Sequence, residues 1–188
     1  MDLILGSLLG LGLAAAAGLR VFVPLLIAGL AARLGHIELA QGFAWLGATP
    51  VLVALGVATL LEALAYQIPW LDNALDALAT PLAALAGTLL MASTLLEVDP
   101  FWRWTLALIA GGGVASAVQG GTTGLRLAST AGTGGLANPL LAAGETGGAV
   151  TLGLVAVLLP VLAGLLVLAA LGLGLRGLLR RWRRRTAS

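Results

Sequence analysis

The feature that most constrains this chain is an apolar run of about thirty residues, Leu3 to Ala32, that carries a single charge, Arg20. Ser7 is the only other polar side chain in it. Because roughly 20 apolar residues cross a bilayer, the run is long enough to span a membrane. A guanidinium at membrane depth costs about 3 kcal/mol on insertion scales, so it persists where it faces a partner, a cavity or a ligand. Arg20 is therefore the first candidate for a binding site.

Composition extends this prediction to the whole chain. Of the 188 residues, 60% are hydrophobic and 10% are charged, against roughly 25% charged residues in a soluble domain. The strands of a β-barrel would show alternating apolar and polar residues, and the sequence lacks this pattern, so helices are expected. The chain has no cysteine, which excludes disulfides and thiolate chemistry. Its single histidine, His36, argues against a histidine-based metal centre, and we expect no resident cofactor.

Positive charge gathers at the C-terminal end. All ten basic residues are arginines, and six of them follow the last apolar stretch: Arg176, Arg180, Arg181, Arg183, Arg184 and Arg185. A basic cluster directly after a span marks the cytoplasmic side and attracts anionic lipid headgroups. We therefore expect residues 176–188 to form a cytoplasmic tail that contacts the bilayer surface rather than nucleic acid.

Proline-containing pairs suggest where the helices begin. A proline is tolerated at the first helical position, and a preceding Thr, Asp or Asn can cap the helix. The pairs are Thr49-Pro50, Thr80-Pro81, Asp99-Pro100 and Asn138-Pro139. The predicted spans are Leu3–Leu34, Pro50–Gln67, Pro81–Leu96, Pro100–Gln119 and Ala149–Leu175, the last with a kink at Pro160, and residues 70–78 are predicted to form an interfacial helix.

The first predicted span is too long to be one straight crossing. A helix over Leu3–Leu34 would measure about 48 Å at 1.5 Å per residue, whereas the hydrocarbon core is about 30 Å thick. Gly18 and Pro24 are the predicted sites of a break. Pro24 lacks the N–H that would otherwise bond to the carbonyl of Arg20, so the break and the charge coincide.

Residues 120–148 interrupt the apolar pattern. They are rich in glycine and hydroxyl side chains, contain Arg126, and end in a short apolar piece between Asn138-Pro139 and Glu145. We predict a broken or re-entrant segment with breaks at Gly134, Gly135 and Pro139, since irregular backbone at membrane depth must be buried or line a cavity. The expected fold is an all-α, polytopic transmembrane bundle forming a single domain over residues 1–188. It has about five spans, or six or seven if broken segments count separately.

A possible internal repeat relates residues 1–96 to residues 97–175. Gly18-Leu19-Arg20 and Gly124-Leu125-Arg126 each follow a small-residue helix and precede a short apolar piece, as in transporters built from two repeats. Gly174-Leu175-Arg176 also occurs, so the repeat remains open. Gly6, Gly10 and Ala14 recur every fourth residue, the spacing of close membrane-helix packing, within the chain or in a homo-oligomer.

Arg20 and Arg126 are the leading site candidates. They would bind an anion beside broken helices, with glycine-rich backbone N–H groups completing the site. The alternative is a structural pairing of an arginine with Glu62 or Glu145. Thr130 and Asn138, from the glycine and hydroxyl segment, are further binding candidates.

Two other carboxylate sets admit two interpretations each. Glu62 shares a helix face with Thr59 and Tyr66 and could accept a proton or cation, or pair with an arginine. Asp72 and Asp76, four residues apart, could hold magnesium against a phosphate headgroup. The wider acidic motif of such enzymes is absent, so a solvated polar face is the preferred interpretation of these two aspartates.

Several stretches resemble a bacterial membrane family catalogued as domain of unknown function 4126. They are residues 18–24 (GLRVFVP), 68–73 (IPWLDN), 79–81 (ATP), 127–130 (LAST) and 134–139 (GGLANP). The resemblance implies a small, multi-pass inner-membrane protein and supplies no activity. From the residues themselves, a transporter or channel for a small ion or solute is the favoured function. The alternatives are a lipid-headgroup enzyme or binder and a structural or assembly protein, and an enzyme is the less favoured class.

Overall fold

The structure is a computed structural model that describes the backbone of residues 2–66 and 69–185; it leaves the side chains of residues 69–77, 178 and 181–185 undescribed. All regular elements in this part of the chain are helical, which confirms the all-α prediction. They are α1 (Leu3–Ala17), α2 (Phe22–Arg33), the short η1 (Ala44–Gly47), α3 (Thr49–Ala65), α4 (Pro69–Thr94), α5 (Pro100–Leu106), the π-helical η2 (Ala107–Gly112), α6 (Gly113–Thr133), α7 (Asn138–Leu158) and α8 (Pro160–Arg185).

The first apolar run is broken between α1 and α2, as predicted, at residues 18–21. Gly18 has an ordinary helical φ of −70°, so it is not needed for a left-handed turn. A Cβ atom at Gly18 would lie 2.5 Å from the carbonyl oxygen of Ala115, so the glycine permits close packing against α6. Pro24, also predicted at the break, lies just after it. Pro24 lies in the first turn of α2, where its missing N–H removes no helical hydrogen bond.

Thr80-Pro81 does not begin a helix. Helix α4 runs through it from Pro69 to Thr94 and joins the predicted interfacial helix and third span. An internal proline removes one backbone hydrogen bond. Beyond it, Ala83 and Leu90 are fully buried in the core, and this packing favours one continuous helix. The other three pairs do begin helices, but only Asp99 caps with its side chain, which accepts a 2.9 Å hydrogen bond from the N–H of Phe101.

The helix that begins at Pro100 does not fade near Gln119. Elements α5, η2 and α6 follow one another without a gap up to Thr133, so the predicted irregular segment at 120–133 is helical. Two of its hydroxyls donate to carbonyls of their own helix: Thr122 Oγ1 to the Gln119 carbonyl at 2.9 Å, and Thr133 Oγ1 to the Ser129 carbonyl at 2.8 Å. The predicted break at Gly134 and Gly135 is confirmed, because both adopt a positive φ, of 64° and 86°.

Two further predictions were also wrong: the re-entrant piece between Asn138-Pro139 and Glu145, and the last span over Ala149–Leu175. Helix α7 is continuous over 21 residues from Asn138 to Leu158, and Pro139 stands in its first turn rather than in a break. Leu159, with φ −138° and ψ 66°, then turns the chain, and Pro160 begins α8. Pro160 is thus a helix boundary and not a kink, which matches the preference of proline for the first helical position.

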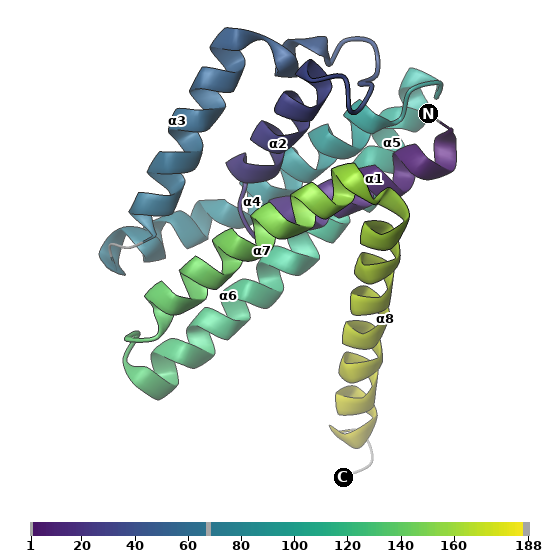
Figure 1. The fold of residues 1–188 in the computed structure, drawn as a ribbon. Coiled ribbons are helices and arrows are strands. Elements are labelled where there is room, and N and C mark those ends of the chain that lie inside the picture. The colour runs from purple at the N-terminus through teal and green to yellow at the C-terminus, as the bar shows by residue number, and fades with distance from the viewer. Residues whose placement is uncertain (1, 67–68, 186–188) are drawn as a thin grey trace.

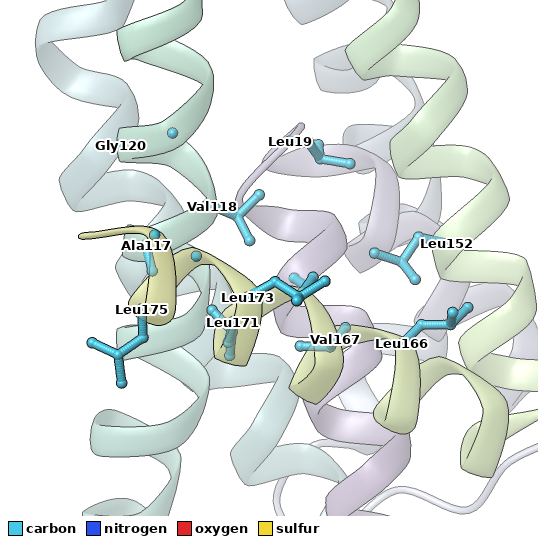
Figure 2. Close-up of a pocket in the computed structure, with 15 residues that line it drawn as sticks. Leu19, Ala117, Val118, Gly120, Leu152, Leu166, Val167, Leu171, Leu173 and Leu175 are labelled. Atoms are coloured by element: carbon cyan, nitrogen blue, oxygen red, sulfur yellow. The ribbon is translucent and has the colours of Figure 1, made fainter. Parts of the chain in front are cut away.

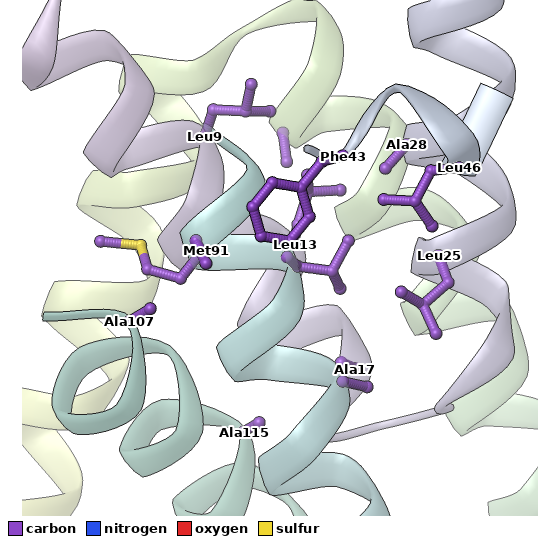
Figure 3. Packing of buried hydrophobic residues seen from close by; sticks show 14 of the residues in the cluster. Leu9, Leu13, Ala17, Leu25, Ala28, Phe43, Leu46, Met91, Ala107 and Ala115 are labelled. Carbon is purple, nitrogen blue, oxygen red and sulfur yellow. The ribbon is translucent and has the colours of Figure 1, made fainter. Parts of the chain in front are cut away.

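Helix α1 lies in the middle of the bundle, and α4, α7 and α8 pack around it (Figure 1). Leu9, Leu13 and Ala17 of α1 are fully buried in the hydrophobic core (Figure 3). The predicted close packing holds at Gly10, where an added Cβ would lie 2.5 Å from the Met91 sulfur. Small residues therefore let the central helix approach its neighbours closely.

The outer helices present apolar side chains outward. Asn138–Leu158 and the stretch Pro160–Gly177 are long and apolar enough to cross a membrane, and 22% and 17% of the residues in an apolar 18-residue window of each are buried inside the protein. Helix α3 packs against α2 and η1 at one side of the bundle (Figure 1). On α3, Leu60 and Leu64 are more than 60% exposed.

Candidate functional site

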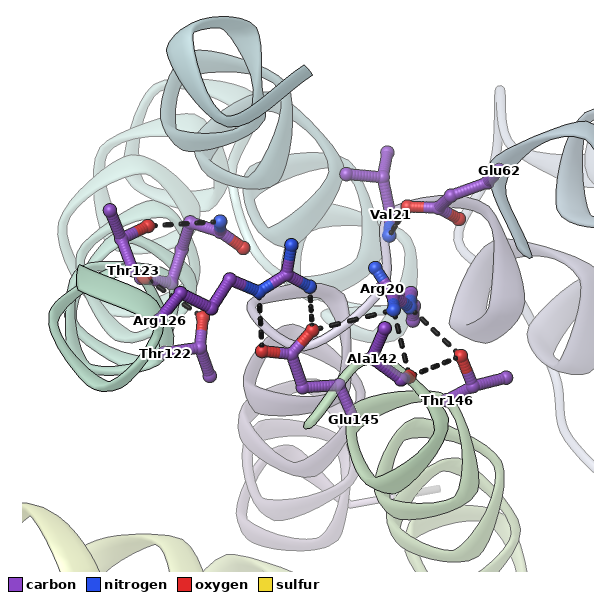
Figure 4. A network of polar contacts seen from close by, with 10 residues as sticks. Arg20, Val21, Glu62, Thr122, Thr123, Arg126, Ala142, Glu145 and Thr146 are labelled. Atoms are coloured by element: carbon purple, nitrogen blue, oxygen red, sulfur yellow. Dashed lines mark hydrogen bonds and ion pairs between the residues drawn. The ribbon is translucent and has the colours of Figure 1, made fainter. Parts of the chain in front are cut away.

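Arg20 lies in the break between α1 and α2, and its side chain is directed to α7. It is 2% exposed. Its Nε donates to Thr146 Oγ1 at 2.9 Å, and its Nη2 donates to the carbonyl oxygen of Ala142 at 2.8 Å. The same Nη2 lies 3.4 Å from Glu145 Oε2. One turn of α7 thus supplies a hydroxyl, a carbonyl and a carboxylate to this guanidinium (Figure 4).

Arg126 reaches the same carboxylate from α6. It is 4% exposed and lies inside the helix, not beside the break at Gly134. Its Nε donates to Glu145 Oε1 at 3.1 Å, and its Nη2 donates to Glu145 Oε2. Two parallel N–H···O contacts of this kind form the bidentate pair that arginine and carboxylate favour. Glu145 therefore bridges two guanidiniums (Figure 4).

A buried tyrosine joins both arginines. Tyr66, directly after the last residue of α3, is 7% exposed. The Cζ atom of Arg20 lies 3.9 Å from the centre of its ring, and that of Arg126 lies 4.4 Å away. Both distances are well inside the roughly 6 Å limit for a cation–π interaction. The C-terminal end of α3 thus contacts the arginines directly.

Glu62 contacts backbone N–H groups. Its Oε1 accepts from the N–H of Val21 at 2.9 Å, and its Oε2 accepts from the N–H of Phe22 at 3.1 Å. These are the first N–H groups of α2, which has no side-chain cap from its own sequence. A carboxylate is stabilised there by the helix dipole. Glu62 therefore caps α2 from a neighbouring helix.

Thr130 and Asn138 lie apart from this network, at the α6–α7 turn. Asn138 Nδ2 donates to Thr130 Oγ1 at 3.2 Å, which ties the two helices together across Gly134 and Gly135. Asn138 Oδ1 is buried and accepts no hydrogen bond within the described residues. Their role as binding residues stays a prediction.

The predicted magnesium ligands cannot be placed. Asp72 and Asp76 fall in α4, and their side chains lie outside the described residues, as do those of residues 181–185 in the tail. Within the part of the chain that is described, no group of three or more histidine, aspartate or glutamate side chains could hold a metal ion.

Sequence reasoning missed three contributors to the network: the Thr146 hydroxyl, the Ala142 carbonyl and the N–H groups at the start of α2. Thr146 had a signal, because it adjoins Glu145 in the sequence. The Ala142 carbonyl had none, since any residue type carries one. We refer to Arg20, Glu62, Tyr66, Arg126, Glu145 and Thr146 together as the arginine network.

Two pockets lie outside the arginine network. The larger, of about 1230 Å³, is an apolar groove between α8 and helices α1, α6 and α7. The smaller, of about 590 Å³, lies beside the loop after α2 and includes Arg33 and Glu38. Neither is lined by a residue of the network.

The fold and the site define a helical-bundle protein with apolar outer helices and a buried arginine–glutamate network. The chain belongs to the family described as Domain of unknown function (DUF4126), whose model matches residues 7–180. No curated protein and no solved structure shows significant similarity to it. The family carries no assigned activity, so a function has to be argued from the network itself.

Proposed function

We propose that this protein is a multi-pass protein of the bacterial inner membrane that transports a small anion through a site at Arg20 and Arg126. The observation that carries the proposal is the convergence of these two buried guanidiniums, from α6 and from the α1–α2 break, on the carboxylate of Glu145. Convergent arginines at a helix break form the kind of site that recognises carboxylate or phosphate groups.

The exposure of α7 and α8 supports the membrane location. Most of their residues face outward, which differs from the core helix of a soluble protein, and they lie too far along the chain to be a signal sequence. The proposed topology has five passes, α3, α4, α5 with α6, α7 and α8, and a re-entrant pair formed by α1 and α2, whose 15 and 12 residues are each short of the roughly 20 that cross a bilayer. The arginine-rich end of α8 then lies in the cytoplasm by the positive-inside rule, and the N-terminus lies outside.

The contacts of the network support an anionic substrate. Arg20 bonds to a hydroxyl and a carbonyl oxygen and pairs with Glu145. The first N–H groups of α2 hold the carboxylate of Glu62. Two carboxylates of the chain thus occupy positions that suit an oxyanion.

Helix α3 is the proposed moving part. Glu62 and Tyr66, four residues apart, contact the start of α2 and the two arginines. Helix α3 packs mainly against α2 and η1. Because few packing contacts hold it, an outward movement of α3 would uncover the arginines at modest cost, whereas movement of the central α1 would disrupt the core.

The test is anion flux into proteoliposomes, with chloride, phosphate and acetate as the probes. We expect wild-type flux of at least one probe above that of empty liposomes, and at least a tenfold loss in Arg20→Gln. Arg33→Gln is the matched control, since Arg33 is exposed and bonds to Thr49 Oγ1 away from the network. Equal flux through folded wild type and Arg20→Gln would refute the role of Arg20.

A structural role is the second candidate, because each arginine of the network has a partner within the chain. On that interpretation the network only fastens α3, α6 and α7 to the break after α1. Wild-type protein would then show no flux of any probe, and Arg20→Gln would lower stability alone. A lipid-headgroup enzyme would depend on Asp72 and Asp76, and no described contact favours it.

A further inference from the structure

The apolar groove beside α8 lies away from the arginine network. One wall is the stretch of α8 from Leu166 to Gly177, and the other is formed by parts of α1, α6 and α7, including Val118 and Leu152 (Figure 2). The α8 wall is about 17 Å long at 1.5 Å per residue. Half of a roughly 30 Å hydrocarbon core is about 15 Å, so the groove matches the depth of one bilayer leaflet.

Protein side chains leave this groove unfilled. Gly120 and Gly121 on the α6 wall, and Gly174 and Gly177 on the α8 wall, have no atom within 4 Å of an added Cβ. The glycines of the core differ, since a Cβ at Gly12 would lie 2.7 Å from Ala156. The groove glycines therefore do not serve helix packing, and they widen an apolar channel instead.

Positive charge adjoins the C-terminal end of the groove. Arg176 lies between the lining residues Leu175 and Gly177, and both Arg176 and Arg180 are exposed. Arg180 follows Gly177 by three residues, so it lies on the same face of α8 one turn further on. The sequence continues with Arg181, Arg183, Arg184 and Arg185. An apolar channel that ends at a cluster of arginines is complementary to one acyl chain below an anionic headgroup.

We propose that the groove is a binding site for an anionic phospholipid. One acyl chain lies along α8 between Leu166 and Gly177, and the headgroup phosphate contacts Arg176 and Arg180. A second copy of this chain fits less well, because pairing through α8 would bring two arginine clusters together, and like charges at an interface are unfavourable. The site is independent of the anion transport proposed above.

The test measures lipid retained by the purified full chain with native mass spectrometry, after delipidation and re-addition of phosphatidylglycerol or phosphatidylcholine. Gly121→Leu fills the groove and suits a helix better than glycine does. Gly132→Leu is its control, because Gly132 also lies on α6 in open space and does not line the groove. Arg176→Gln/Arg180→Gln removes two charges at the groove, and Arg184→Gln/Arg185→Gln removes two beyond it.

We expect wild type and Gly132→Leu to retain phosphatidylglycerol at least threefold over phosphatidylcholine. Gly121→Leu should lose at least two thirds of both lipids. Arg176→Gln/Arg180→Gln should lose the preference for phosphatidylglycerol but retain as much total lipid as wild type. Arg184→Gln/Arg185→Gln should keep both the preference and the amount of lipid. Wild-type retention by Gly121→Leu would overturn the site, and so would equal loss of preference in the two arginine pairs. A dimer that dissociates in Gly121→Leu, with retention unchanged, would identify a second copy as the occupant.

Discussion

Replacing Glu145 by glutamine tests the network at its centre. The substitution keeps the size of the side chain and removes the charge that Arg20 and Arg126 share. At the 3.4 Å separation of Arg20 Nη2 and Glu145 Oε2, Coulomb's law with an effective dielectric constant near 20 gives about 5 kcal/mol. Breaking a buried ion pair by removing one partner typically costs 3–5 kcal/mol. We therefore expect the free energy of unfolding to fall by about 3–5 kcal/mol.

The assay is thermal unfolding of the purified protein in detergent micelles, followed by circular dichroism. A chain of this size shifts by about 2–4 °C per kcal/mol, so the midpoint should fall by roughly 6–20 °C. Glu97→Gln is the control, because Glu97 is exposed. The double variant Glu145→Gln/Arg126→Gln should recover part of the loss, since it also removes one of the two guanidiniums that share the charge of Glu145.

The single variant Glu145→Gln also separates an effect on stability from an effect on anion binding. With Glu145 neutral, Arg20 lacks its ion-pair partner, and an added anion should take that place. Phosphate or acetate should therefore raise the unfolding midpoint of Glu145→Gln more than that of wild type. A midpoint for Glu145→Gln within 1 °C of Glu97→Gln (roughly half a kcal/mol) would refute the reasoning, because the bridging charge would then contribute nothing.

Gly18→Ala and Glu62→Ala test the helix break, with Gly120→Ala as a control. Gly18→Ala should lower the free energy of unfolding by about 1–3 kcal/mol, because its Cβ would lie 2.5 Å from the Ala115 carbonyl oxygen. Gly120→Ala, in open space, should instead raise it by up to about 1 kcal/mol, and thermal midpoints that move in the same direction would contradict this. Glu62→Ala should cost about 1–2 kcal/mol as a lost cap. Hydrogen exchange would show faster exchange of the Val21 and Phe22 amides, and unchanged rates would count against the cap.

The sequence predicted the helical class, the break after α1 and the turn at Gly134 because each has a local cause. The helical class follows from the apolar content, and the break after α1 follows from a small-residue helix that ends at a charge. The turn follows from the paired glycines Gly134 and Gly135. Each of these signals affects only the backbone within a few residues of it. It also identified the four charged residues that meet in the network. Arg20, Arg126, Glu62 and Glu145 were detectable because charges are rare in such a chain.

Some errors arose where long-range packing overrode a local preference, and others arose where polar side chains found partners within their own helix. Pro81 disfavours a continuous helix, yet the buried residues after it hold α4 together. The glycines and hydroxyls after Gln119 disfavour a helix in water, yet intrahelical hydroxyl bonds allow one there. The partner of Glu62 was not predictable, because any helix start offers N–H groups and only the tertiary structure selects α2.

The π-helical turn η2 has a consequence for how related chains must be aligned. A π turn holds one residue more than an α turn, and each residue of an α-helix turns the chain by about 100°. Every side chain after Gly112, Arg126 included, therefore lies about 100° around the axis from where a regular helix would carry it. A relative that lacked one residue between Ala107 and Gly112 could form a regular α-helix there and still direct its arginine toward Glu145, because an α turn would replace the π turn with one residue fewer. A relative that kept every residue but formed a regular α-helix there would instead direct its arginine about 100° away from Glu145. A one-residue gap within η2 is therefore compatible with the network.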